Sequence, residues 1–446
     1  MPNRPNILLM IADDHRFNAI HALGDETVKT PTLDALIESG VTFRRTHIMG
    51  SMVGAVCVPS RAALLTGTNL FRSGGQPIGE GLAVLPQVLR EAGYTTFATG
   101  KWHNDKQTFA KGCQGGGKLF FGGMSDHLKV PVYDFDPDGA YPKSAEYIGE
   151  GFSTALFADT ATEFLDSYEE DAPFFLYLAF TSPHDPRMAP ADFAAMYPPA
   201  DIPLPPNFVP EHPFDNGEMR IRDEMLAPFP RTPEAVQQHI ADYYAMITHM
   251  DAWLGHVLSA LDQDGYADNT LVLYMADHGL AVGQHGLMGK QNLYDHSVRV
   301  PLIMRGPGLP QGKTVDALTY LYDVFPTLCD LVGIDIPETV EGESLRPLMT
   351  GEKQRVRDTV YSAYKDYQRM VSDGRWKLIR YYRSQETGAG SERLQLFDLA
   401  NDPWETRDFS EAAEHRPKVQ RLASALETWQ AKVSDPLAGT PVLPTG

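Results

Sequence analysis

Four short strand-like runs in the sequence are each followed by polar side chains that bind metals or anions or transfer protons. In chain order these side chains are Asp13 and Asp14, Lys101 and His103, His184, and Asp277 and His278. In an open parallel sheet the ligand crevice lies beyond the carboxyl ends of the strands. We therefore expect these residues to share one site, although each taken singly is more often a helix cap, a turn former or a satisfied polar residue.

The three aspartates in this set predict a site for a hard divalent cation. Carboxylate oxygens are the ligands that Ca²⁺ and Mg²⁺ prefer. Clustering Asp13, Asp14 and Asp277 without a cation would cost electrostatic repulsion. The alternative is that the three residues lie apart and that each caps a local element. His278 adds an imidazole, which suits softer ions than Ca²⁺.

The segment that begins at Cys57 is the most specific one in the chain, and it reads Cys57-Val58-Pro59-Ser60-Arg61, followed by Leu65-Thr66-Gly67. Pro59 suits the first turn of a helix. Cys57 is then at or just before the helix N-terminus, where free amide groups and the helix dipole stabilise an anion. This setting predicts a reactive cysteine, and the alternative is a structural one.

These residues resemble the signature of the type I sulfatases of the alkaline phosphatase superfamily, which is Cys-x-Pro-Ser-Arg followed by Leu-Thr-Gly. The resemblance covers most of the chain. It includes Asp13-Asp14, Gly100-Lys101-Trp102-His103, Ser182-Pro183-His184, Ala276-Asp277-His278-Gly279, Lys290, Val298-Arg299-Val300-Pro301-Leu302, Leu396-Phe397-Asp398-Leu399, Asp402-Pro403 and Glu405. Two positions depart from it: many members have Asn where this chain has His278, and a Leu-Gly pair is common where it has Asn104-Asp105.

The resemblance implies that a formylglycine-generating enzyme oxidises Cys57 to formylglycine, whose hydrated aldehyde is the nucleophile. It also implies one divalent cation, Ca²⁺ ahead of Mg²⁺ or Mn²⁺. The implied metal ligands are Asp13, Asp14, Asp277, His278 and the modified Cys57.

The resemblance further implies a division of roles among the other site residues. Asp277 would take the proton of the attacking hydroxyl, and His103 would deprotonate the second hydroxyl so that the aldehyde reforms. Lys101 and Lys290 would hold sulfate oxygens, although a lysine such as Lys290 is otherwise usually a solvated surface residue. His184 would protonate the leaving oxygen, and Arg61 would brace the modified residue.

The predicted function is hydrolysis of a sulfate monoester to an alcohol and inorganic sulfate, and a carbohydrate sulfate is the substrate class by analogy. The alternatives in the same superfamily are an arylsulfatase and a phosphonate monoester or phosphate diester hydrolase. A glycan-binding module with a dead site is a third interpretation. It predicts the loss of a ligand or of the nucleophile, whereas every expected position is filled.

Strand-like and helical patterns alternate along the first three quarters of the chain, which is typical of βαβ units around a mainly parallel sheet. Strands are predicted at residues 6–11, 95–99, 173–180, 270–275 and 300–304. Helices are predicted at residues 30–40, 85–92, 153–168 and 233–261. The glycine-rich residues 112–123 are predicted to form a loop, and the proline-rich residues 190–233 a long insertion.

The predicted fold class is therefore α/β, with a mainly parallel sheet sandwiched by helices as in alkaline phosphatase. The pattern changes near Gly351, where residues 367–382 form two alternating runs joined at Asp373-Gly374, a hairpin signal. A further strand is expected at residues 394–399. We predict a catalytic domain at residues 1–350 and a smaller C-terminal α+β subdomain with a short antiparallel sheet at residues 351–446.

Composition limits the partners and the compartment. The formal net charge of −20 on 446 residues argues against binding to nucleic acid or to an acidic membrane surface. No apolar run reaches the roughly 18 residues of a membrane span. Three cysteines are too few for a disulfide framework. Without a visible signal peptide we expect a cytoplasmic protein, or a periplasmic one if a leader was removed, and a homo-oligomer remains compatible with the sequence.

Overall fold

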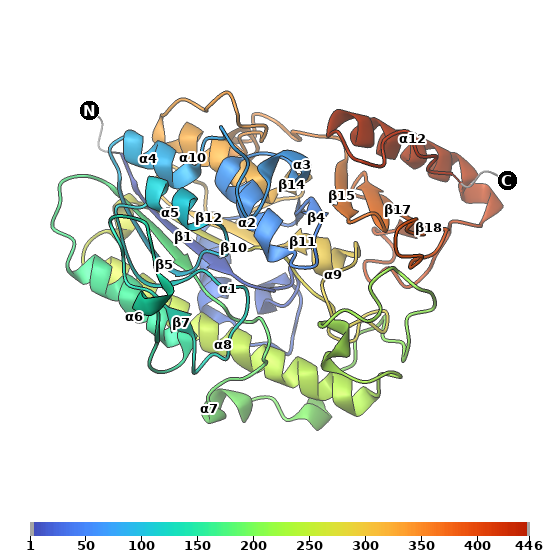
Figure 1. Cartoon of the computed structure of the whole chain (residues 1–446), viewed down its shortest axis with the longest axis horizontal. Coiled ribbons are helices and arrows are strands. Elements are labelled where there is room, and N and C mark those ends of the chain that lie inside the picture. Colours follow the sequence, from blue (N-terminus) through green and yellow to red (C-terminus); the bar gives the residue numbers. More distant parts are fainter. Residues whose placement is uncertain (1–3, 444–446) are drawn as a thin grey trace.

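An eight-stranded sheet forms the centre of the structure, a computed structural model that describes residues 4–443 (Figure 1). The strand order is β13-β2-β12-β10-β1-β9-β5-β6. The strands are β1 (Asn6–Ala12), β2 (Val41–Phe43), β5 (Thr95–Lys101), β6 (Gly115–Phe120), β9 (Phe174–Ala179), β10 (Thr270–Ala276), β12 (Leu302–Arg305) and β13 (Lys313–Val315). All neighbouring pairs are parallel except the two that contain β12. The predicted mainly parallel sheet is confirmed.

Helices cover both faces of this sheet, as Figure 1 shows. One side carries α1 (Pro31–Ser39), α6 (Ser153–Asp166) and α8 (Pro233–Gln263), and the other carries α2 (Cys57–Thr66), α4 (Leu85–Glu91), α5 (Lys106–Gly112) and α10 (Val324–Val332). Every residue of β1, β9 and β10 is buried as a result. Strands buried on both faces read as continuous apolar runs, which is why the sequence revealed them.

A second sheet of five strands lies at the C-terminal end, with α12 (Arg416–Lys432) packed against it (Figure 1). Its order is β18-β17-β16-β15-β4, where the strands are β4 (Gly50–Ser51), β15 (Val360–Tyr364), β16 (Gln368–Ser372), β17 (Trp376–Tyr381) and β18 (Arg393–Asp398). The pairs from β15 to β18 are antiparallel. Gly374 has a φ of 87° in the predicted turn, a conformation that favours glycine. The antiparallel C-terminal sheet is confirmed, and the boundary at residue 350 stays a prediction.

The edge strand β4 comes from the N-terminal third of the chain and pairs in parallel with β15. Gly50 has a φ of 91°, and a Cβ built there would lie 2.0 Å from the carbonyl oxygen of Ala363. Only glycine allows this close approach of two backbones. The segment just before Cys57 is therefore tied to the C-terminal sheet.

Two predictions about individual strands are wrong. Residues 112–123 contain the edge strand β6, parallel to β5, because the glycines leave room for the neighbouring backbone: a Cβ on Gly116 would lie 2.7 Å from the carbonyl oxygen of Ala98. The predicted strand at 300–304 is divided at Pro301, which has no N–H to donate to a ladder. Its first part is β11 (Arg299–Val300), in a three-stranded sheet with β3 (Thr46–His47) and β14 (Thr319–Tyr320), and its second part is β12.

Residues 190–233 form the predicted long insertion and contain only short helices. These are α7 (Ala191–Ala194), η3 (Pro199–Asp201) and η4 (Glu224–Leu226), and α7 and η3 pack against α8. Other short elements are α3 (Leu70–Ser73), α9 (Asp295–Val298), α11 (Arg346–Thr350), β7 (Pro131–Val132) and β8 (Tyr147–Ile148), together with the 3-10 helices η1 (His21–Leu23), η2 (Lys143–Ala145), η5 (Ala267–Asn269), η6 (Leu321–Asp323) and η7 (Ala413–His415). Within residues 4–443, no helix has the length and apolar character to cross a membrane.

Candidate active site

The predicted site residues meet at the carboxyl edge of the central sheet. Asp13 directly follows β1 and Asp277 directly follows β10, and because Ala12 and Ala276 are register partners the two aspartates are neighbours. Lys101 ends β5, and His184 follows β9. All of these residues are buried. Parallel pairing therefore brings together side chains that lie far apart in the chain.

Gly100 is an irregular position within β5, just before Lys101 and His103. Its φ is 88°, and a Cβ there would lie 1.9 Å from the carbonyl oxygen of Ala179 on β9. The β5–β6 register shifts between Thr99 and Gly100. His103 also has a positive φ, of 55°. Such strained backbone is typical of functional sites.

The carboxylate cluster has the ligand atoms of a cation site, and two of these atoms have no hydrogen-bond partner in the described residues. One ligand atom from each of Asp13, Cys57, Asp277 and His278 lies within 4.8 Å of the others. Asp13 Oδ1 and His278 Nε2 are 4.0 Å apart, and both are buried without a hydrogen-bond partner among the residues that the structure describes. Buried polar atoms are normally satisfied. These two orphaned atoms, together with the oxygen-rich donor set, fit a divalent cation.

Each of the three carboxylates also contacts a lysine or arginine side chain. Lys101 Nζ contacts Asp13 and donates to the Gly123 carbonyl at 2.6 Å. Lys290 Nζ is 2.9 Å from Asp14 Oδ1. In the same way, Arg61 Nε is 2.8 Å from Asp277 Oδ2, and both side chains are fully buried. The positive charges hold the carboxylates in place, since a buried charge needs a partner.

These contacts keep two of the carboxylates ionised. Burial acts to raise the pKa of Asp14, but the charges of His184 and Lys290 outweigh it and hold the pKa well below its usual range. Burial likewise acts to raise the pKa of Asp277, and His278 and Arg61 lower it overall. Both groups are therefore available as anionic metal ligands at neutral pH.

Cys57 is the first residue of α2, as predicted from Pro59, and its exposed fraction is 2%. Its Sγ lies 3.1 Å from Nδ1 of His103. Burial, followed by the charge of Lys101, lowers the pKa of His103 to about 2. The imidazole is then neutral and can accept a proton from a group at the position of the sulfur.

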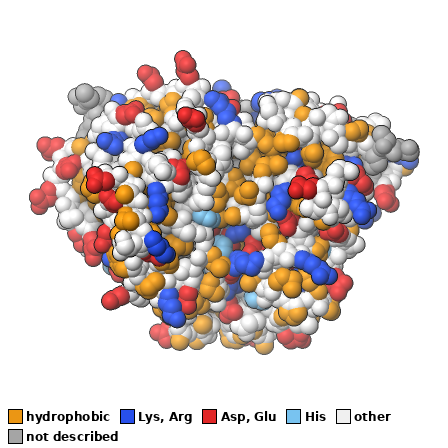
Figure 2. Space-filling view, viewed as in Figure 1, with side chains coloured by type: hydrophobic (Ala, Val, Ile, Leu, Met, Phe, Trp, Pro, Cys, Tyr) orange, Lys and Arg blue, Asp and Glu red, His pale blue; other side chains and the backbone are white. Residues whose placement is uncertain are grey.

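A cavity of about 250 Å³ opens above Cys57. Its lining residues are Gly54, Ala55, Cys57, His103, Gly123, Met124, His184, Ile221, Arg222, Asp223, Lys290 and Gln291. Figure 2 shows histidine side chains at the bottom of a hollow in the middle of this face. The hollow gives a small anionic group access to Cys57 and Lys290.

Sequence reasoning missed a group of charged residues at the cavity wall. Arg222, from the insertion, contacts Asp185 at 2.6 Å and 3.0 Å and Asp223 at 2.7 Å and 3.1 Å. Its Nη1 also lies 2.6 Å from the sulfur of Met124. All five N–H donors of the guanidinium are thereby used. No sequence motif marked Arg222, and the only available signal was that Asp185 follows His184.

The two departures from the family pattern have different places in the structure. Asn104 donates to the carbonyl oxygens of Val58 at 3.1 Å and Gly75 at 2.8 Å, and Asp105 caps α5. Neither residue lines the cavity. Their hydrogen bonds instead hold the segment between β5 and α5 in place. His278 instead belongs to the candidate cation site, with its Nδ1 3.1 Å from Asp14 Oδ1.

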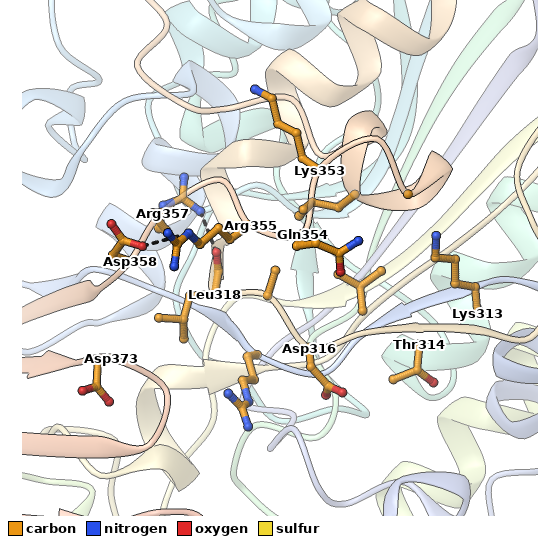
Figure 3. Close-up of a pocket in the computed structure, with 15 residues that line it drawn as sticks. Lys313, Thr314, Asp316, Leu318, Lys353, Gln354, Arg355, Arg357, Asp358 and Asp373 are labelled. Carbon is orange, nitrogen blue, oxygen red and sulfur yellow. Dashed lines mark hydrogen bonds and ion pairs between the residues drawn. The ribbon is translucent and has the colours of Figure 1, made fainter.

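A larger cavity, of about 450 Å³, lies beside β13 and α11 and contains none of the predicted site residues (Figure 3). Charged side chains dominate its wall, and several are already paired. Arg355 contacts Asp358 at 3.1 Å, and Arg357 donates to the carbonyl of Leu318 at 3.2 Å, as the dashed lines in Figure 3 show. Size alone therefore does not locate the active site.

Comparison with known proteins agrees with this geometry. The family described as Sulfatase matches residues 5–334. This chain belongs to the sulfatase family. A second family, N-sulphoglucosamine sulphohydrolase, C-terminal, matches residues 283–432 of this sulfatase, a range that includes β15 to β18. The protein is accordingly a sulfuric ester hydrolase.

Characterised relatives match nearly the whole sulfatase chain. The N-acetylglucosamine-6-O-sulfatase of Bacteroides thetaiotaomicron is 25% identical, over 97% of this chain and 87% of its own length. The arylsulfatase of Clostridium perfringens is 27% identical, over 95% of this chain and 94% of its own length. The match therefore includes both sheets.

Solved structures show the same fold. A protein in complex with its substrate D-glucosamine-2-N,6-O-disulfate superposes with a TM-score of 0.81 at 23% identity, covering 99% of this chain and 100% of its own. The phosphonate monoester hydrolase of Agrobacterium radiobacter superposes with a TM-score of 0.77 at 24% identity, covering 96% of each chain.

Proposed function

We propose that this sulfatase hydrolyses a sulfate monoester of a carbohydrate and that its nucleophile is a formylglycine made from Cys57. The observation that carries the proposal is the position of Cys57, which starts α2 at the bottom of the cavity. Its Sγ lies 3.1 Å from His103 Nδ1 and is one of the ligand atoms of the candidate cation site. N-acetylglucosamine and glucosamine sulfates are the named substrates of relatives and neighbours, which supports the sugar assignment.

The residues present fit a divalent cation, with Ca²⁺ ahead of Mg²⁺ or Mn²⁺, held by Asp13, Asp14, Asp277, His278 and the modified Cys57. When bound, the cation would polarise the nucleophile and the sulfuryl group. His278 would have to be neutral to serve as a ligand. In the structure, burial acts to lower the pKa of His278, and the charge of Asp277 raises it overall. Cation binding and proton release from His278 would then occur together.

The chain's own residues would manage charge and protons around the sulfate. Lys290 lines the cavity, and burial acts to lower its pKa while Asp14 raises it well above the usual value, so it is a permanent cation for sulfate oxygens. Arg61 braces Asp277 and donates to the Lys101 carbonyl at 2.6 Å. These contacts fix the side chain of Asp277 and the backbone of Lys101.

His184 is suited to protonate the leaving oxygen. Its Nδ1 donates a hydrogen bond to the carbonyl oxygen of Asp185 at 2.7 Å, so Nε2 is the atom left for the substrate. His184 lines the same cavity as Cys57. Its position matches a general acid that acts on the alcohol side of the ester.

The upper wall of the cavity would receive the sugar. Met124 and Ile221 present apolar surface there, and Arg222 is partly exposed although its N–H groups are all occupied. A saturated guanidinium offers its flat face rather than its donors. The wall therefore favours stacking against a sugar ring over a second charge-assisted contact.

Peptide mass spectrometry and a substrate panel test the proposal. Protein made with a formylglycine-generating enzyme is expected to lose the Cys57 thiol, and Cys57→Ala is expected to abolish turnover of N-acetylglucosamine 6-sulfate. Cys113→Ala is the matched control, because Cys113 is also buried but lies outside the cavity. High activity with an intact Cys57 thiol would refute the nucleophile. Faster turnover of a phenyl phosphonate ester than of any sulfate would favour a phosphonate monoester hydrolase, the function of a structural neighbour.

A further inference from the structure

A third cavity, of about 320 Å³, is lined in part by Arg16 and Asn18, which belong to the segment that follows β1. It shares no lining residue with the cavity above Cys57. Its walls come from the turn at residues 24–27, the insertion at residues 203–206, helix α8 and Trp404, which follows β18. Its volume is within the range of small-molecule sites.

Arg16 is the unusual residue of this cavity. It lines the wall, yet only 3% of the residue is exposed. Its Nε and Nη1 are buried and have no hydrogen-bond partner in the described part of the chain. The guanidinium lies 5.9 Å from the ring centroid of Tyr243, and a contact with a ring face does not satisfy the N–H groups. A buried cation with unpaired donors is costly, so an external partner would stabilise it.

The carboxylate of Asp25, on the same wall, is already committed to other donors. Asp25 Oδ1 accepts from the backbone N–H groups of Thr27 at 3.1 Å and Val28 at 3.3 Å, and its Oδ2 accepts from the Tyr244 hydroxyl at 2.5 Å. A second polar atom at the cavity, Oδ1 of Asn18, is also buried without a partner in residues 4–443. The cavity thus holds both an unused charged donor and an unused acceptor.

We propose that this cavity is a second binding site, which accepts an acidic sugar with its carboxylate on Arg16. The planar fork of a guanidinium matches a carboxylate in a bidentate contact. The Asn18 Oδ1 accepts a hydrogen bond from a hydroxyl group of the sugar, and the aromatic side chains of Trp404 and Tyr244 provide apolar surface for the ring. The occupant is thus a uronic acid residue, as a free sugar or as part of a longer chain.

The two sites are separate but lie close along the backbone. The Tyr243 hydroxyl accepts from the backbone N–H of Arg16 at 2.9 Å and donates to the carbonyl oxygen of Asp14 at 2.7 Å. Binding at Arg16 does not use any residue of the catalytic cavity, so the proposal does not depend on the proposed function.

Ligand titration followed by NMR tests the site, with glucuronate, glucose and inorganic sulfate as probes. Glucuronate is expected to bind the intact protein and the Cys57→Ala variant with equal affinity, which separates this site from the catalytic cavity. Arg16→Met is expected to weaken glucuronate binding about tenfold or more, the cost of losing a charge-assisted contact. Glucose lacks the carboxylate, so its affinity for the intact protein is expected to be no higher than the affinity of glucuronate for Arg16→Met.

Several results would overturn the proposal: no binding of glucuronate, equal binding of glucuronate and glucose, or displacement of glucuronate from the Arg16 cavity by an equal concentration of sulfate. If Arg16→Met does not fold, Glu26→Gln replaces it, because Glu26 is an exposed residue on the same wall. Removing that negative charge is expected to tighten glucuronate binding severalfold and to leave glucose unchanged. An unchanged affinity for glucuronate would reject the site.

Discussion

Replacing His184 with Ala is expected to slow the hydrolysis of a sugar sulfate far more than that of nitrophenyl sulfate. A sugar alkoxide is a poor leaving group and needs a proton as it departs, whereas nitrophenolate is a good leaving group and departs with almost no help from a proton donor. His184 can supply that proton because its Nδ1 is engaged 2.7 Å from the Asp185 carbonyl and its other nitrogen remains for the substrate.

The size of the effect follows from what the variant removes. General acid catalysis contributes about 10²- to 10⁴-fold, and a factor of ten corresponds to about 1.36 kcal/mol, so the barrier for the sugar sulfate should rise by about 2.7 to 5.4 kcal/mol. His184 is 4% exposed and Nε2 is 3.8 Å from Asp14 Oδ2, so the substitution also leaves a small void beside a carboxylate. Any fall in kcat/KM caused by this void affects both substrates equally, so the kcat/KM for nitrophenyl sulfate measures it.

The assay measures kcat/KM for intact protein, His184→Ala and His184→Gln on N-acetylglucosamine 6-sulfate and nitrophenyl sulfate. His184→Gln keeps a polar side chain of similar reach without proton transfer, and it should show the same selective loss. An exposed histidine, His256, provides a control substitution that should leave both rates unchanged. An equal loss on both substrates in His184→Ala would refute the role of leaving-group acid.

Three further predictions concern charge in the site and in the fold. Lys290→Ala is expected to reduce kcat/KM about 10²-fold or more on both substrates, because it removes a fixed charge from the sulfate whatever alcohol leaves; a loss confined to one substrate would contradict this. Removing divalent ions with a chelator is expected to abolish activity, which Ca²⁺ or Mg²⁺ should restore, whereas restoration by zinc alone would exclude a hard cation. Lys377→Met is expected to lower the free energy of unfolding by about 3–5 kcal/mol, because the fully buried Lys377 is 2.8 Å from both Asp295 and Glu405. Urea denaturation measures this change, and a loss below about 1 kcal/mol would show that the two carboxylates are stabilised in another way.

Local patterns in the sequence were sufficient for much of the catalytic core. The buried strands β1, β9 and β10 are apolar apart from their first residues Asn6 and Thr270. Polar residues follow each strand within a few positions, so parallel pairing predicts that Asp13, His184 and Asp277 converge. Pro59 in the first turn placed Cys57 at the start of α2. Each of these inferences depends on neighbours in the chain or on one general rule of sheet topology.

Only the tertiary structure decided the walls of the site and the edges of the sheets. Arg222 meets Asp185 across 37 positions of the chain, and β4 joins β15 although more than 300 residues separate Gly50 from Ala363. The strand β6 forms from a glycine-rich segment because a neighbouring backbone needs that space. Local propensity and periodicity describe what a segment prefers alone, whereas these features arise from the surfaces that distant segments present to one another, which no local pattern encodes.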